Sequence, residues 1–223
     1  MHFKTVLALL VVISVISVFF YMGFKEQIDS VLTGLSTARV YIYRTLPYNC
    51  SINLTQGMNL VSFYCIADKS ALNSTLKDIN NNTLNYSAIY SYGSDEASDP
   101  WGSYSPLLPN WTVQTLNEID RKHGYVIIMN QNQTFFNQGY HFRLTQMNLK
   151  KGWNLVSYPV GIEKNLSDVL ASIEGNYTMV KTFRDGEWIY YNPLTNQGNL
   201  SVMKPGEAYW INLTQALELV VNW

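Results

Sequence analysis

Residues 6–24 form an apolar run without a charged side chain. Nineteen residues in an α-helix rise about 28 Å, which matches the hydrocarbon core of a bilayer. The run therefore predicts a transmembrane helix that inserts into lipid. A cleaved signal peptide, with a shorter apolar stretch and small residues close behind it, is the alternative. The sequence after Phe24 is Lys25-Glu26-Gln27, which offers no such cleavage site.

The charges around this run predict its orientation. Lys4 and the amino terminus precede it, whereas Lys25, Glu26 and Asp29 behind it sum to −1. Positive charge favours the cytoplasmic side of a membrane. We therefore expect a single-pass protein of the cell membrane, with a cytoplasmic N-terminus and an extracellular C-terminal ectodomain.

Glycosylation acceptors support the same topology. The chain has 22 Asn residues, none before Asn49, and 33 Ser and Thr residues among its 223, so chance gives about three Asn-x-Ser/Thr sequons. Eleven are present. The acceptor residues are Asn49, Asn53, Asn73, Asn81, Asn85, Asn110, Asn132, Asn165, Asn176, Asn199 and Asn212. This excess on one side of the apolar run indicates an exported glycoprotein.

The helix is expected to continue beyond the bilayer to about residue 37. Ile28, Val31, Leu32 and Leu35 recur at helical spacing and form one apolar stripe. Such a stripe fits a stalk that packs on the ectodomain. It also fits a pilin-like helix that packs against copies of itself in a filament.

Composition favours a mainly β ectodomain. The chain has 16 Tyr and 6 Trp, which suit half-buried sheet surfaces better than helices. Its net charge is −1 and no basic run is present, so nothing points to nucleic acid as a partner.

An internal repeat defines the organisation behind the anchor. Residues 52–65 (INLTQGMNLVSFYC) resemble residues 147–160 (MNLKKGWNLVSYPV), and further matches follow in the same order. The repeat predicts an anchor and helical stalk at 1–37, a first β module at 38–143 and a second at 144–223. Each module is expected to carry one short helix, and the C-terminal strand to complete the second.

The second module resembles a known repeat of archaeal and bacterial cell-surface proteins. The resemblance covers about 75 residues. It rests on Lys151-Gly152-Trp153-Asn154-Leu155-Val156-Ser157-Tyr158-Pro159, on Trp188 and Tyr191-Asn192-Pro193, and on Pro205-Gly206-Glu207-Ala208-Tyr209-Trp210-Ile211. The first module is degenerate, with Met58 and Tyr64 in place of Trp and Pro. The resemblance implies an extracellular β module with a structural or accessory role and brings no catalytic residues.

Cys50 and Cys65 are the two cysteines of the chain. In an exported protein such a pair predicts a disulfide. If residues 50–65 form a hairpin that turns at Gly57 and Met58, these cysteines lie opposite each other and a cross-strand disulfide is plausible.

Two surface sites are candidates for binding. Exposed aromatic side chains stack on sugars, which makes Trp101, Tyr104, Trp111 and Trp188 possible glycan contacts, although the same residues could fill the core of a small β fold. The loop with Asp95, Glu96 and Asp99 is a weak candidate for Ca²⁺, because its spacing matches no known calcium loop.

Catalysis finds little support in the sequence. Only three His are present, no Cys/His cluster has metal-ligand spacing, and no nucleophile elbow or glycine-rich phosphate loop occurs. We therefore expect a non-enzymatic protein without a cofactor.

The best interpretation is a structural or adhesive component of a prokaryotic envelope, with archaea favoured. Its expected partners are glycans, further copies of the same chain or other envelope proteins. The alternatives are a pilin-like filament subunit and an accessory subunit of a membrane complex.

Overall fold

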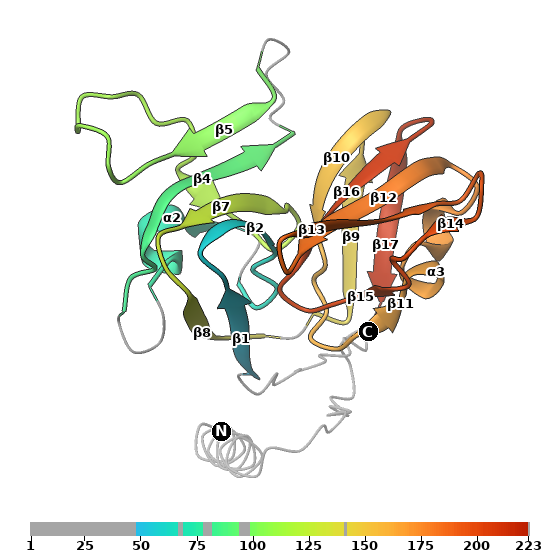
Figure 1. Cartoon of the computed structure of the whole chain (residues 1–223), viewed down its shortest axis with the longest axis horizontal. Coiled ribbons are helices and arrows are strands. Elements are labelled where there is room, and N and C mark those ends of the chain that lie inside the picture. Colours follow the sequence, from blue (N-terminus) through green and yellow to red (C-terminus); the bar gives the residue numbers. More distant parts are fainter. Residues whose placement is uncertain (1–47, 67–68, 78–81, 94–98, 141, 223) are drawn as a thin grey trace, which may run out of the picture. The chain divides into compact units, whose positions relative to one another are not determined.

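The computed structural model describes residues 48–66, 69–77, 82–93, 99–140 and 142–222. They belong to one compact unit, which is mainly β, as predicted (Figure 1). The predicted anchor and stalk, residues 1–37, lie outside these ranges. Within the described ranges, no helix is long and apolar enough to cross a membrane.

The first half contains eight strands and one short helix. In chain order they are β1 (Tyr48–Leu54), β2 (Gly57–Val61), β3 (Ser70–Ala71), α2 (Leu72–Thr75), β4 (Tyr86–Tyr92), β5 (Trp101–Tyr104), β6 (Glu118–Ile119), β7 (Tyr125–Met129) and β8 (Gln133–Gly139). Strands β2, β7, β4 and β5 form a four-stranded antiparallel sheet, and β1–β8 and β3–β6 form separate pairs.

The second half repeats this arrangement with one strand more. Its elements are β9 (Leu144–Leu149), β10 (Gly152–Ser157), β11 (Lys164–Asn165), α3 (Leu166–Val169), η1 (Ala171–Ile173), β12 (Tyr177–Arg184), β13 (Glu187–Asn192), β14 (Gln197–Gly198), β15 (Val202–Met203), β16 (Ala208–Leu213) and β17 (Leu217–Asn222). The sheet order is β10-β16-β12-β13-β14, with β9–β17 and β11–β15 as pairs. The C-terminal strand β17 thus pairs with β9 outside the larger sheet.

The two halves also share strand register. Gly57 pairs with Met129 at one end of β2–β7, and Gly152 pairs with Leu213 at the same end of β10–β16. The inner strands β4 and β12 carry a register shift at the same place, just after Tyr86 and Tyr177. Equivalent residues can therefore be assigned through strand pairing, independently of sequence similarity.

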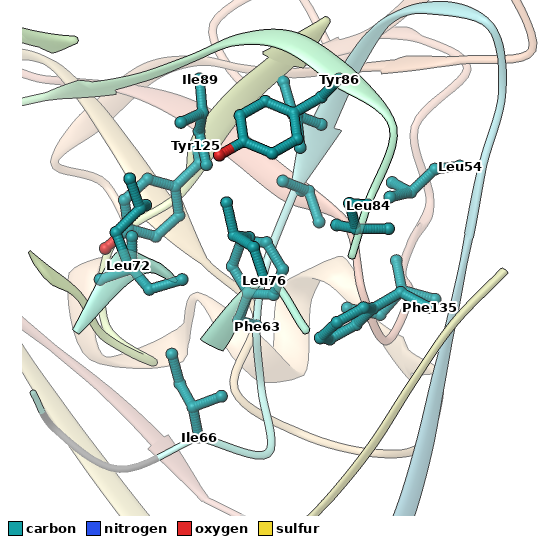
Figure 2. Packing of buried hydrophobic residues seen from close by; sticks show 14 of the residues in the cluster. Leu54, Phe63, Ile66, Leu72, Leu76, Leu84, Tyr86, Ile89, Tyr125 and Phe135 are labelled. Atoms are coloured by element: carbon teal, nitrogen blue, oxygen red, sulfur yellow. The ribbon is translucent and has the colours of Figure 1, made fainter. Parts of the chain in front are cut away.

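Each half has its own apolar core. Alternate residues of β1 and β9 are buried, as expected for strands with one face on a core. In the first half, side chains from β1, β4, β7, β8 and α2 form one cluster with Phe63, whose ring contacts those of Tyr125 and Phe135 (Figure 2). In the second half, Tyr158, Ile173, Val180 and Tyr209 take part in a separate cluster.

The Gly-x-Asn motif builds the same turn in both halves. Gly57 and Gly152 have φ angles of 91° and 89°, a left-handed conformation that glycine adopts without a steric penalty. Two residues on, the amide of Asn59 donates to the backbone oxygens of Thr55 and Gly57. Asn154 makes the equivalent bonds in the second half. The motif thus fixes the start of β2 and β10.

The structure confirms the disulfide between Cys50 and Cys65, but the predicted hairpin is wrong. Strand β1 pairs with β8, whereas β2 pairs with β7 in another sheet. The turn at Gly57 therefore passes the chain from one sheet to another and does not join paired neighbours. The disulfide connects β1 to the turn that follows β2.

Candidate functional site at the junction of the two halves

Reciprocal backbone bonds join the two halves. The N–H of Ser62 donates to the oxygen of Gly206 over 2.9 Å, and the N–H of Ser157 donates to the oxygen of Lys122 over 3.1 Å. Ser62 and Ser157 are equivalent residues in the repeat, and so are Lys122 and Gly206. Each half therefore donates an equivalent backbone hydrogen bond to the other. Such a reciprocal pair is expected when two halves are related by a local pseudo-twofold axis.

An apolar cluster lies beside these bonds. Leu60, Leu155 and Ala208 are buried in it, and four half-buried residues pack against them: Tyr92, Val126, Phe183 and Trp210. The cluster contains three equivalent pairs, Leu60 with Leu155, Tyr92 with Phe183, and Val126 with Trp210. These side chains occupy the sheet faces opposite the two main cores.

Aromatic rings continue outward from this cluster. Trp210 lies 4.9 Å from Tyr92, 6.0 Å from Trp101 and 6.2 Å from Trp153, measured between ring centroids. Lys181 then bridges two rings, with its Nζ 4.8 Å from Trp153 and 4.7 Å from Trp188. We name the set Tyr92, Trp101, Trp153, Lys181, Trp188 and Trp210 the aromatic surface.

This surface is accessible from solvent. Trp101, Trp153 and Trp188 expose 41%, 38% and 46% of their area. Exposed aromatic groups that gather on one face of a protein mark binding sites more often than single exposed side chains do. Planar rings beside an ammonium group offer stacking and hydrogen bonding together, which suits a sugar or another amphipathic ligand.

The four predicted glycan contacts separate in the structure. Trp101 and Trp188 belong to the aromatic surface. Tyr104 lies on the other face of β5 and packs against the first core. Trp111 is 85% exposed in the loop after β5, and it takes part in none of the ring contacts that build the aromatic surface.

Sequence reasoning missed Trp153 and Trp210 as members of this site. In the sequence both residues stand out only as parts of the repeat motifs. Strand alternation contained the signal, because Trp153 precedes the half-buried Asn154 and Trp210 lies between the buried Tyr209 and Ile211. Both indoles therefore point away from the core of their own half.

A polar groove of about 540 Å³ lies between β1 and the turn before β16. At its wall, Arg184 donates two hydrogen bonds of 2.7 Å to Glu207, and these bonds raise the pKa of Arg184. The hydroxyl of Tyr209 also donates to Glu207, and burial raises the pKa of Tyr209 well above its usual value. Glu207 is thus held by three donors, which fits a structural ion pair.

The turn before β7 carries the second charged contact of the junction. Asp120 accepts hydrogen bonds from the N–H groups of Lys122 and His123 and from the His123 ring. Burial raises the pKa of Asp120, but these donors and the His123 charge outweigh it, so the net pKa is lowered. Lys122 in turn accepts the backbone bond from Ser157.

This lowered pKa predicts a loss of stability in acid. A carboxylate with a depressed folded pKa stabilises the fold above its ordinary pKa, and that stability is lost as the pH falls through the folded value. We expect Asp120→Asn to cost about 1–2 kcal/mol at pH 7 and to flatten the stability profile below about pH 4. Denaturant titrations of the detergent-solubilised chain between pH 2 and 7 measure this effect. The exposed Glu187→Gln is the control, and equal profiles for both variants would contradict the prediction.

The sequon asparagines are accessible. Ten of the eleven fall within the described ranges, and none of the ten is buried. Eight are exposed, while Asn176 and Asn212 are half-buried; Asn81 lies outside the described ranges. A bulky sugar can therefore be attached at these positions without displacing the core.

The structure adds little on metal binding. Asp95 and Glu96 of the calcium candidate lie outside the described residues, and Asp99 accepts a hydrogen bond from the N–H of Trp101. Among the residues that the structure describes, no group of three or more His, Cys, Asp or Glu is placed to hold a metal ion.

Comparison with known proteins gives no assignment. No family model, no characterised protein and no solved structure matches this chain.

Proposed function

We propose that the chain is a non-enzymatic, membrane-anchored surface glycoprotein of a prokaryotic envelope. Among prokaryotes, we favour an archaeal source. The accessibility of the sequon asparagines carries this proposal, since all ten described acceptors reach solvent. The disulfide between Cys50 and Cys65 supports it, because such bonds persist outside the reducing cytosol. The apolar run at residues 6–24 supplies the lipid anchor.

We further propose that the two halves are duplicated modules of the surface-protein repeat that the second half resembles. Their common strand pairing and register support a duplication. The reciprocal backbone bonds would keep the modules in a fixed arrangement. This rigidity suits a mechanical role at the cell surface.

The proposed topology can be tested by protease treatment of intact cells that carry a C-terminally tagged chain. We expect the tag to be removed while the cells remain closed, and the remaining N-terminal fragment to stay in the membrane after an alkaline wash. A tag that is degraded only after lysis would contradict the proposal.

The N-terminus separates the anchor from its alternatives. An intact Met1 on the membrane-bound protein supports a permanent anchor, whereas a trimmed start at the apolar run indicates a pilin-like subunit. Partners that stay bound through detergent purification would indicate an accessory subunit of a membrane complex.

Adhesion to glycans is the activity that the aromatic surface supports. A ligand that covers one of these rings removes a large apolar area from water, and this burial favours binding. We expect Trp101→Ala and Trp188→Ala each to weaken binding on a glycan array at least tenfold. Trp111→Ala is the matched control, because Trp111 is exposed but lies outside the aromatic surface. Equal losses in all three variants, or no binding by the unmodified protein, would exclude this mode of adhesion.

A further inference from the structure

Asn212 lies directly beside the aromatic surface. In the β10–β16 pair Asn212 is the register partner of Trp153, and on its other side it faces Met179 of β12. Directly opposed residues of an antiparallel pair point to the same face, with Cβ atoms about 4.5–5.5 Å apart. The amide of Asn212 and the indole of Trp153 therefore share the outer face of the sheet.

The side chain of Asn212 differs from most other sequon asparagines. The amides of Asn49, Asn53, Asn85, Asn132, Asn165, Asn176 and Asn199 are hydrogen-bonded to other groups. Asn212 is half-buried, and no hydrogen bond within the described ranges involves its side-chain amide. The side-chain atoms of Asn212 are not among those buried without a partner, so solvent reaches the amide. Because no competing protein contact holds it, the amide is available for attachment of a sugar.

The first half shows what this position holds when no sugar can be attached. There the equivalents of Trp153 and Asn212 are Met58 and Ile128, which form an apolar pair in the same register. The second half instead places an indole, 38% exposed, next to a sequon. The change from two aliphatic residues to a ring and an acceptor fits a sugar that stacks on the ring.

We propose that a glycan attached to Asn212 folds back over Trp153 and covers the centre of the aromatic surface. This inference rests on the proposed export and glycosylation of the chain. The apolar face of the first sugar would stack on the indole, while its hydroxyls would lie within reach of the Lys181 ammonium, which already sits 4.8 Å from that ring. Trp101 and Trp188 would remain on either side.

Two measurements on the full chain from its native host test this proposal. Peptide mapping reads the occupancy of each sequon, and hydroxyl-radical footprinting reads the accessibility of Trp153. We expect Asn212 to be occupied. We also expect the oxidation rate of Trp153 to rise at least threefold in Asn212→Gln and in Thr214→Ala, which removes the sequon and leaves Asn212 in place. Trp111 should be unchanged, and so should Trp153 in the control variant Asn110→Gln.

The outcomes distinguish this inference from the proposed function. If other sequons carry sugar and Asn212 does not, the inference fails and the surface glycoprotein stands. If Asn212 carries sugar but Trp153 oxidises at the same rate in all variants, the stacking is excluded. If no sequon is occupied, both proposals fail.

Discussion

Replacing Cys50 and Cys65 together by alanine should lower the free energy of unfolding by about 3 kcal/mol. The disulfide closes a loop with a sequence separation of 15 residues, and its loss gives the unfolded chain more conformational freedom. Both cysteines are also buried in the first core, so the substitution adds a small packing loss. Urea denaturation of the detergent-solubilised chain, with and without reductant, measures the difference.

Reductant supplies the internal control for this prediction. It should destabilise the unmodified protein by nearly the same amount and leave the double variant unaffected. The second half holds Thr145 and Val160 at the equivalent positions and has no such bond, so the effect should be confined to the first half. A double variant as stable as the oxidised protein would show that the disulfide is dispensable.

Gly124→Ala should lower the free energy of unfolding by about 2–3 kcal/mol, because the added methyl group overpacks the junction. This value lies near the upper end of the usual cost of overpacking. A Cβ atom at residue 124 would lie 2.6 Å from the Cβ of Ala208 and 2.8 Å from the backbone oxygen of Val156. Neither neighbour can move easily, because Ala208 is fully buried and Val156 belongs to the paired strand β10. We expect the melting temperature to fall by about 5–10 °C.

Two further variants make this test specific. In Gly124→Ala/Ala208→Gly the small and the larger residue exchange places across the pseudo-twofold axis, so part of the lost stability should return. Gly102→Ala is a control of the same chemistry, since its Cβ would meet chiefly the hydroxyl of Ser91, the end of a flexible side chain. Equal losses in Gly124→Ala and Gly102→Ala would contradict a tightly packed junction.

Local patterns in the sequence predicted the local structure well. The abundance of Tyr and Trp indicated the β-rich fold, and Gly57 indicated a turn, which the structure places there and at the equivalent Gly152. The cysteine pair predicted the disulfide without help from the strand order, because it needed only two thiols and an oxidising compartment.

These local patterns could not predict which strands pair with each other when they lie far apart in the sequence. The hairpin expected around Gly57 was wrong because a glycine turn fits a passage between sheets as well as a turn between paired neighbours. The junction also required the strand order. Strands β2 and β10 pack one face on the core of their own half and the other on the apolar cluster at the junction, so apolar residues such as Leu60 and Val61 do not reveal what covers each face.

The aromatic surface likewise required the strand order. Trp101, Trp153, Trp188 and Trp210 come from four different strands of two sheets, and only strand pairing and the contact of the halves bring them together. Hydrophobic pattern alone could not separate Trp101, which faces outward, from Tyr104, which packs inward three residues later.

The most direct test of this account is peptide mapping of the protein extracted from host membranes under non-reducing conditions. Export predicts that sequon peptides from the region beyond residue 48 carry covalent sugar, and that the peptides with Cys50 and Cys65 are joined until reductant is added. Unmodified asparagines together with two alkylatable thiols would contradict a surface glycoprotein.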